Sequence, residues 1–113
     1  MANQYGWIGV DLDGTLAHYT NWNPDGSIGE PIQPMVDRVK RWLAEGQTVK
    51  IFTARVAVSS GKEQVIKKIK AWCKKYIGQE LEVTNIKDHA MIQLWDDRAV
   101  QVERNTGRII GNK

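Results

Sequence analysis

Three separate stretches of this sequence carry side chains that can do chemistry on a phosphate group. Asp11 and Asp13 stand near the start, Thr53 lies near the middle, and the pair Asp96-Asp97 lies near the end. Carboxylates gathered in one place repel one another, and this repulsion raises their pKa values. A hard divalent cation removes the conflict, and Mg²⁺ prefers a few carboxylates together with water and substrate phosphate. If the fold brings these stretches together, they predict a magnesium site that takes phosphate.

A carboxylate beside a bound phosphate can also act as a nucleophile and form an aspartyl-phosphate. Phosphoryl transfer otherwise needs in-line positioning and neutralisation of charge. The hydroxyl of Thr53 can hold phosphoryl oxygens, Arg55 can either reach the phosphate or form a structural ion pair, and Lys87 would add a fixed positive charge. Each stretch alone has a more ordinary explanation, because runs such as Asp-x-Asp-Gly also occur in turns and calcium loops. The functional interpretation therefore depends on their combination.

The elements that must position these groups follow from the apolar pattern. Short apolar runs at residues 7–10, 49–52 and 91–95 each end just before one of the polar stretches, and such runs are typical of buried strands. Residues 81–83 are expected to form a further short strand. A helix is expected from Pro34 to just before Gly46, because its apolar residues recur at helical spacing and proline fits the first turn.

A second helix is expected to begin at a capping box of Ser60 and Glu63 and to end at Gly78. This segment is rich in lysine, which could form a polyanion-binding stripe, but a solvated outer face is the ordinary explanation and is the one we adopt. Strands that alternate with helices predict an α/β fold with a mostly parallel sheet flanked by helices. In such sheets ligands bind beyond the carboxyl ends of the strands, where the polar stretches would meet.

Two segments are expected to form hairpins. Residues 17–33 are rich in Asn, Pro and Gly, and a turn is expected at Pro24-Asp25-Gly26. This segment follows the first strand. Near the end of the chain, residues 100–103 and 108–110 flank Asn105-Thr106-Gly107 and could pair in the same way.

The composition is that of a globular protein. The 113 residues suit one domain, residues 1–113, and a content of 42% hydrophobic and 26% charged residues excludes a disordered or collagen-like chain. No apolar run is long enough to cross a bilayer. Residues 1–5 lack the apolar core of an export signal, and the single Cys73 suits a reducing compartment, so we expect a cytoplasmic protein. Sixteen basic and 13 acidic residues give a net charge of +3, which suits an anionic substrate.

The polar stretches resemble the motifs of the haloacid dehalogenase superfamily of phosphohydrolases. Residues 11–16, Asp-Leu-Asp-Gly-Thr-Leu, resemble its first motif, and residues 51–55, Ile-Phe-Thr-Ala-Arg, resemble its second. Residues 94–99 resemble the fourth motif in its paired-aspartate form. Residues 85–88, Asn-Ile-Lys-Asp, occupy the place where small phage and bacterial members often have Asn-Lys-Pro. The resemblance spans residues 5 to about 103 and implies a Rossmann-like core.

The resemblance also implies roles for individual residues. Asp11 would attack phosphorus, and Asp13 would protonate the leaving oxygen and then activate water. Thr53 would hydrogen-bond a phosphoryl oxygen. Lys87 would stabilise charge on the nucleophile and the phosphate. Because Lys87 lies closer to the fourth motif than the catalytic lysine of many relatives does, Lys62 is kept as a second, weaker candidate. The Mg²⁺ site would consist of four aspartates, of which Asp13 contributes its backbone carbonyl: Asp11, Asp13, Asp96 and Asp97.

The segment between the first motif and Pro34 is too short for a cap domain, so the resemblance implies a capless enzyme with a β-hairpin flap. An open site admits bulk water unless a large substrate or a neighbouring subunit excludes it. Capless members therefore tend to act on macromolecular phosphates or to form homo-oligomers. On the flap, His18 and Trp22 are the main candidates for substrate contacts, together with Tyr19 and Asn23. Trp22 could stack on a base or sugar or pack against another subunit, and packing is the commoner role of such a residue.

These observations predict a Mg²⁺-dependent phosphomonoesterase. A nucleotide or a phosphorylated nucleic-acid end is the first expected substrate, and a sugar phosphate or a phosphoprotein is the alternative. A receiver domain also gathers acids at strand ends, but its phosphoacceptor lies on a middle strand, where this chain has Thr53. A catalytically weak module that binds metal or phosphate is the remaining alternative.

Overall fold

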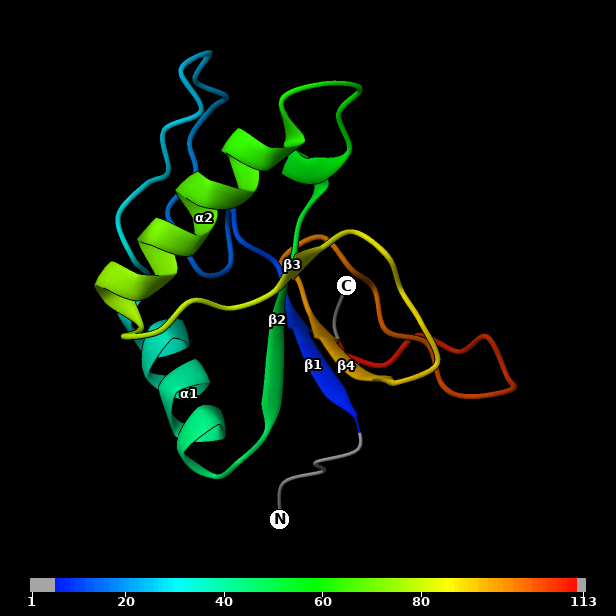
Figure 1. Ribbon diagram of the computed structural model, residues 1–113. Coiled ribbons are helices and arrows are strands. Elements are labelled where there is room, and N and C mark those ends of the chain that lie inside the picture. Colours follow the sequence, from blue (N-terminus) through cyan, green and yellow to red (C-terminus); the bar gives the residue numbers. More distant parts are fainter. Residues whose placement is uncertain (1–5, 112–113) are drawn as a thin grey trace.

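In the computed structural model, which describes residues 6–111, four strands form one sheet in which every neighbouring pair is parallel (Figure 1). The strand order is β3-β2-β1-β4. The strands are β1 (Trp7–Val10), β2 (Thr48–Phe52), β3 (Val83–Thr84) and β4 (Met91–Trp95). The α/β class with a parallel sheet is confirmed. The expected strand at residues 81–83 is displaced, because Leu81 is buried in the core and the chain pairs with β2 only from Val83.

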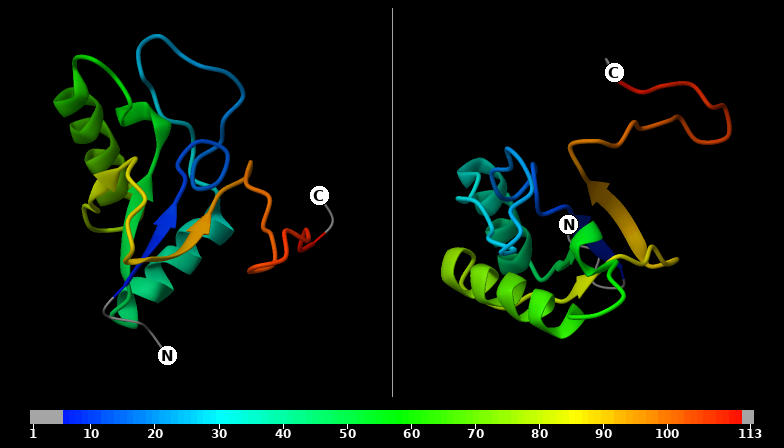
Figure 2. Two further views of the ribbon diagram at one scale, coloured as in Figure 1. Left: turned by 90° about the vertical axis from the view of Figure 1, so that its right-hand side faces the viewer. Right: turned by 90° about the horizontal axis from the view of Figure 1, so that it is seen from above.

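Both helices lie on the same face of the sheet. Helix α1 (Gln33–Ala44) connects β1 to β2, and helix α2 (Lys62–Tyr76) connects β2 to β3. These two crossovers step across the sheet in the same direction, and because parallel crossovers are right-handed, both helices pack on one side (Figures 1 and 2). The connection back to β4 at residues 85–90 contains no helix. The described residues therefore leave the other face without a helical layer.

The hydrophobic core lies between the helices and the sheet. Ile8 and Val10 of β1 and Ile51 of β2 point into it and meet Val39 of α1 and Ile69 of α2, all nearly inaccessible to solvent. This alternation is what a strand with one buried face predicts. On the opposite face, apolar side chains of β4 and of the chain after it stay exposed, namely Ile92, Leu94, Val100, Val102, Ile109 and Ile110.

The helix ends show one success and one error of sequence reasoning. Helix α1 has proline in its first turn, and Gly46 follows its C-cap with φ +86°, a conformation that favours glycine. The capping box predicted for α2 is wrong. Gly61 occupies the N-cap with φ +75° and no side-chain cap bond, so Ser60 lies outside the helix. The chain reaches α2 through a left-handed turn after a short 3-10 helix, η1 (Ala54–Val56), which no local capping pattern indicates.

The two predicted hairpins exist only as single bridges. Ala17 pairs antiparallel with Pro31, and the His18 N–H donates to the Glu30 carbonyl at 2.8 Å. The expected flap turn is present, because the Gly26 N–H donates to the Asn23 carbonyl at 2.9 Å. The flap (residues 17–31) is otherwise irregular. Near the C-terminus, Val102 and Ile109 form the corresponding bridge.

Within residues 6–111, no helix has the length and apolar character needed to cross a membrane. Residues 1–5, on which the expectation of no export signal rests, lie outside the described part of the chain.

Candidate functional site

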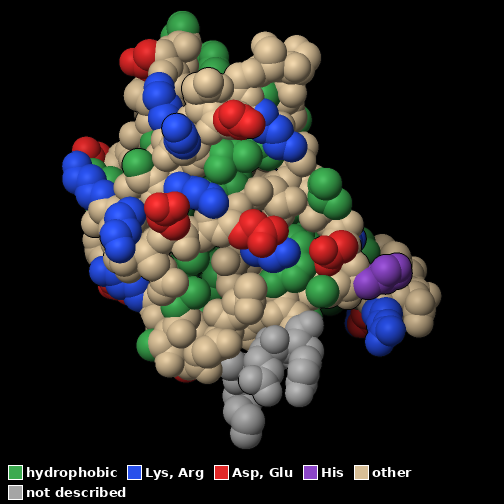
Figure 3. Space-filling view, viewed as in Figure 1, with side chains coloured by type: hydrophobic (Ala, Val, Ile, Leu, Met, Phe, Trp, Pro, Cys, Tyr) green, Lys and Arg blue, Asp and Glu red, His purple; other side chains and the backbone are tan. Residues whose placement is uncertain are grey.

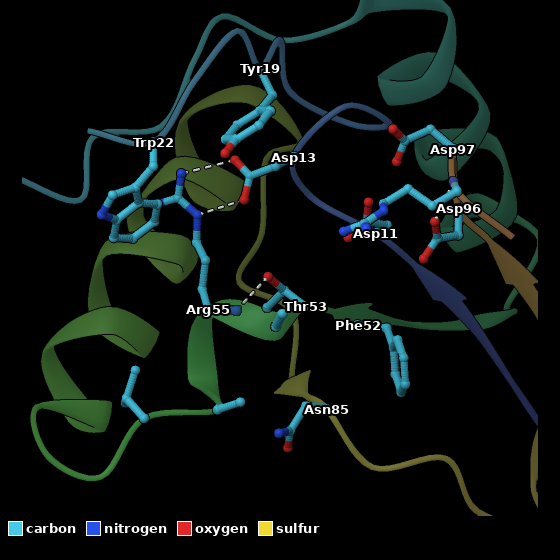
Figure 4. A pocket seen from close by; sticks show the side chains of 14 residues that line it. Asp11, Asp13, Tyr19, Trp22, Phe52, Thr53, Arg55, Asn85, Asp96 and Asp97 are labelled. Carbon is cyan, nitrogen blue, oxygen red and sulfur yellow. Dashed lines mark hydrogen bonds and ion pairs between the residues drawn. The ribbon is translucent and has the colours of Figure 1, made fainter. Parts of the chain in front are cut away.

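The parallel register brings the polar stretches to one edge of the sheet. Val10 lies beside Ile51 of β2 on one side and beside Trp95 of β4 on the other, so the residues that follow these strands emerge together. The Asp11 N–H donates to the Trp95 carbonyl at 2.9 Å, which fixes the nearest pair of strand ends. A cavity of about 840 Å³ opens at this edge (Figure 4). Its lining includes Asp11, Asp13, Tyr19, Trp22, Phe52, Thr53, Arg55, Asn85, Asp96 and Asp97.

Three carboxylates meet on one side of this cavity. Asp11, Asp96 and Asp97 each place one carboxylate oxygen within 4.8 Å of the others. Thr15 holds Asp97 in place, because its hydroxyl donates to Asp97 Oδ1 at 3.3 Å and accepts from the Asp97 N–H at 3.1 Å. The donor set is all oxygen, which is what a hard cation such as Mg²⁺ requires, with water completing its coordination. We call these three residues the carboxylate corner.

Gly14 makes room for the carboxylate corner. Its φ is +88°, and a Cβ at this position would lie 2.6 Å from Asp97 Oδ2. Any larger residue would therefore need an unfavourable backbone conformation and would collide with the Asp97 carboxylate. The glycine of the Asp-x-Asp-Gly run thus has a packing reason that the sequence does not reveal, since Asp97 is far away along the chain.

The environment of Asp11 opposes its ionisation. The pKa of Asp11 is raised to about 7, first by burial and then by the hydrogen bond to Asp97 and the negative charges of Asp96 and Asp97. A cation bound at the carboxylate corner would reverse these effects, because it would offset the charges that keep a proton on the group. The protein thus gathers negative charge that the corner's own three side chains cannot neutralise.

In a second corner of the cavity, an acidic side chain is neutralised by a basic side chain of the same chain. Arg55 binds both oxygens of Asp13, with Nε at 2.7 Å from Oδ2 and Nη2 at 2.8 Å from Oδ1. The same guanidinium donates to the carbonyls of Gly26 at 2.9 Å and Ser27 at 3.0 Å, and it lies 5.2 Å from the centre of the Trp22 ring. Arg55 therefore ties Asp13 to the flap, and Asp13 points toward Arg55 (Figure 4). We call this group the arginine corner.

Thr53 lies between these two corners. It is 3% exposed, and its N–H donates to the Thr84 carbonyl at 3.0 Å, which anchors it to β3. Its Oγ accepts the Arg55 N–H at 3.1 Å, an interaction that caps η1. This bond leaves the hydroxyl proton of Thr53 available for a phosphoryl oxygen in the cavity.

The structure does not bring every predicted site residue to the cavity. Lys87 lines a separate hollow along the outer side of β4, with Trp95 and Asp96. Lys62 begins α2 and lines neither hollow. His18 lines a small hollow under the flap rather than the main cavity. The side chain of Asp13 is not part of the carboxylate corner, although its predicted contribution to the metal is a backbone carbonyl.

Several lining residues were not predicted as site residues, among them Phe52, Asn85 and Val58. Phe52 ends β2 and Asn85 follows β3, so their positions at strand ends are the signal that could have indicated them. Val58 lies in the turn between η1 and α2, and nothing in its local sequence marks it.

Comparison with known proteins identifies the fold alone. The sequence matches no protein-family model and no curated protein. A solved structure, that of a conserved protein from Bacteroides thetaiotaomicron, is similar with a TM-score of 0.59 and 23% sequence identity, over 83% of this chain and 77% of that one. The fold and the site thus define an α/β protein whose parallel strands gather three carboxylates, a threonine and an arginine at one edge.

Proposed function

We propose that this protein is a Mg²⁺-dependent phosphomonoesterase, a capless member of the haloacid dehalogenase superfamily that works in the cytoplasm. One observation carries the proposal: Asp11 shares a corner with Asp96 and Asp97, while Thr53 and Asp13 stand beside it in the same cavity. A phosphate held there would have a nucleophile, a hydroxyl donor and a second acid within one cavity. Bound Mg²⁺ would offset the negative charge of the carboxylates and the phosphate.

The proposed reaction has two steps. An Asp11 carboxylate oxygen attacks phosphorus, the ester P–O bond breaks, and Asp13 gives a proton to the departing alcohol oxygen. Asp13 then takes a proton from water as the water oxygen attacks the aspartyl-phosphate. The bond between Asp11 and phosphorus breaks, which restores the Asp11 carboxylate and releases inorganic phosphate.

The arginine corner controls the second acid in this scheme. Asp13 is held by two hydrogen bonds from Arg55 and therefore points away from Asp11. A phosphate in the cavity would compete with Asp13 for the Arg55 donors, because guanidinium binds phosphate oxygens in the same forked geometry. Asp13 would then be free to turn toward the leaving oxygen. Arg55 is thus a positioning residue for Asp13 in the proposed function.

The test is hydrolysis of an aryl phosphate with Mg²⁺ by the full chain and by Asp11→Asn. We expect the variant to lose turnover by about a thousandfold or more, because the nucleophile is missing. Asp37→Asn is the matched control, since Asp37 is an exposed residue of α1 that binds Gln33 at 2.8 Å. Undiminished turnover by Asp11→Asn would overturn the proposal.

A second candidate is a module that binds metal and phosphate with little turnover. The arginine corner favours it, because Asp13 is already occupied by Arg55. Calorimetry separates the two candidates. Binding of inorganic phosphate in the presence of Mg²⁺, without hydrolysis of any phosphomonoester in a broad panel, would support the module.

A further inference from the structure

A second hollow, between the flap and α2, adjoins the site cavity. This hollow has a volume of about 240 Å³ and shares Trp22, Arg55 and Val58 with the site cavity. Its other walls are the flap turn at residues 24–26 and the first half of α2, including Gln64 and Lys68. A ligand with its phosphate at the carboxylate corner can therefore extend past Trp22 and reach α2 without leaving a concave surface.

We propose that the substrate is the phosphorylated end of a single-stranded nucleic acid, which runs from the cavity across Trp22 and along the seam between the flap and α2. This inference rests on the proposed function, because it places the terminal phosphate at Asp11. Three features of the seam support it: the platform that Trp22 forms, the row of lysines beside it, and the excess of basic over acidic side chains on α2.

Trp22 forms a platform at the junction of the two hollows. Its side chain is 56% exposed, and its ring is supported by the Arg55 guanidinium at 5.2 Å. A large aromatic surface held in solvent at a ligand path suits a flat base, and stacking of a base on an aromatic side chain contributes about 1–3 kcal/mol. A small sugar phosphate would end before this platform, and a phosphorylated peptide offers a flat group there only by chance.

The lysines of α2 form two rows, and one of them follows the seam. Lys68 and Lys75 are seven residues apart, so they lie on the same flank of the helix. This flank faces the flap, because Lys68 donates to the Asp25 carbonyl and Trp72 donates to the Gly29 carbonyl at 3.0 Å. The other row consists of Lys67, Lys70 and Lys74, on the opposite flank.

The charge of α2 is only partly balanced by neighbours, of which Asp25 of the flap interacts with Lys68. Six lysines stand against a single acid, Glu63, in this helix. Among residues 6–111, the three ion pairs of the structure involve Lys50, Arg55 and Arg108 and no lysine of α2. Basic side chains gather over the part of the surface where Figure 1 shows α2 (Figure 3). Such a surface attracts a chain of phosphates, and each lysine that meets a phosphate adds affinity that salt weakens.

The test measures binding of a short, fluorescent oligonucleotide with a terminal phosphate to Asp11→Asn in the presence of Mg²⁺. In that background, Lys68→Gln with Lys75→Gln removes the row at the seam, and Lys67→Gln with Lys74→Gln removes the same charge from the opposite flank. We expect the seam variant to weaken binding by about tenfold or more and to lower the salt dependence by about one unit of slope per lysine. The control variant should change binding by less than about threefold. Equal losses in both variants would overturn the proposed path.

Trp22 provides a second measure with the same oligonucleotide. Trp22→Ala should weaken binding by about tenfold, whereas Trp22→Phe should keep most of the affinity, because a smaller ring still stacks. If both substitutions leave binding unchanged, no base stacks on this residue and the inference fails.

Hydrolysis rates distinguish this inference from the proposed function. With the full chain, we expect kcat/KM to rise from aryl phosphate to mononucleotide to phosphorylated oligonucleotide, with the last step lost in the seam variant. Asp11-dependent hydrolysis with no preference for the oligonucleotide over a mononucleotide, or with preference for a phosphopeptide, would overturn the inference and leave the phosphatase intact. Binding with the expected pattern but without hydrolysis of any substrate would overturn the phosphatase and leave the nucleic-acid path intact.

Discussion

The two corners of the cavity differ in what surrounds their carboxylates. In the arginine corner, Asp13 meets a guanidinium that satisfies both of its oxygens. In the carboxylate corner, Asp11 meets two further acids, and its pKa rises to about 7. Asp13 is neutralised by Arg55, whereas Asp11, Asp96 and Asp97 each place a carboxylate oxygen within 4.8 Å of the others. In the proposed function, a divalent cation would bind at the carboxylate corner, where three carboxylates can supply oxygen ligands.

The two corners also differ in how their interactions affect the stability of the folded chain. Arg55 is 9% exposed and binds Asp13 and two flap carbonyls, so it stabilises the flap as well as the acid. The carboxylate corner has the opposite character, because its like charges repel one another. The first three predictions below each alter one corner and leave the other in place, and the last alters a lysine outside both.

The largest effect is expected from removal of the acid pair. Asp96→Asn with Asp97→Asn should lower Mg²⁺-dependent hydrolysis by about a thousandfold, because the cation would lose two of its three carboxylates. The variant should also lose the rise in melting temperature that Mg²⁺ gives the parent chain, which calorimetric melting with and without the metal will measure. Asp37→Asn is again the control. An intact response to Mg²⁺ would show that the cation binds elsewhere.

Next in size is the loss of the arginine corner. Arg55→Gln should lower the free energy of unfolding by about 3 kcal/mol, because it leaves a half-buried Asp13 carboxylate without its partner. The control is Glu82→Gln, which breaks the more exposed Lys50–Glu82 pair at 3.2 Å and should cost less than about 1 kcal/mol. Urea unfolding measures both. Equal losses would show that Arg55 contributes no more than a surface ion pair.

A smaller effect is expected in the pH dependence of stability. The pKa of Asp11 is about 7 in the folded chain, against an ordinary value of 3.8. Between these values the folded state holds a proton that the unfolded state has released, so without metal this group makes stability fall as pH rises from about 4 to 7. Urea unfolding in EDTA should show this decline in the parent chain and lose much of it in Asp11→Asn. Mg²⁺ should flatten the decline by favouring the ionised carboxylate. A parent chain that gains stability through this pH range would contradict the raised pKa.

The smallest effect is expected at Lys87. The sequence predicts a catalytic lysine here, but the side chain lines the hollow on the outer side of β4 and not the site cavity. Lys87→Gln should change kcat/KM for an aryl phosphate by less than about threefold, in the range of an ordinary surface substitution. Lys62→Gln is the matched comparison. A loss of a hundredfold at Lys87 alone would show that this lysine enters the cavity in the substrate complex and would restore the sequence-based prediction.

Sequence reasoning succeeded where a short-range pattern carries the information. The strand Trp7–Val10 and the strand Met91–Trp95 have the predicted bounds, and Asp11 and Asp96 follow them as expected. Apolar runs of this kind have few alternatives inside a small α/β protein, because each must bury a face against helices. The convergence of Asp11 with Asp96 and Asp97 follows from the parallel topology, which was also predicted.

Sequence reasoning failed where contacts between residues far apart in sequence determine the local backbone conformation. Ser60 and Glu63 satisfy a capping pattern, yet the helix begins after Gly61, since the chain must first leave η1. The flap looks like a hairpin, but Arg55, Lys68 and Trp72 take the carbonyls of Gly26, Asp25 and Gly29 in turn, and the flap packs on α2 as an irregular loop.

The order of the residues along the chain thus determined which acids could meet, because strand-forming runs place them at one edge of a parallel sheet. Only the tertiary structure decided which partner each acid contacts. Asp11 and Asp13 are near neighbours of the same type, but the loop after β1 sends one toward the acid pair and the other toward Arg55. The direction of a side chain depends on contacts with residues far away in sequence, and those contacts exist only once the core has brought the strand ends together.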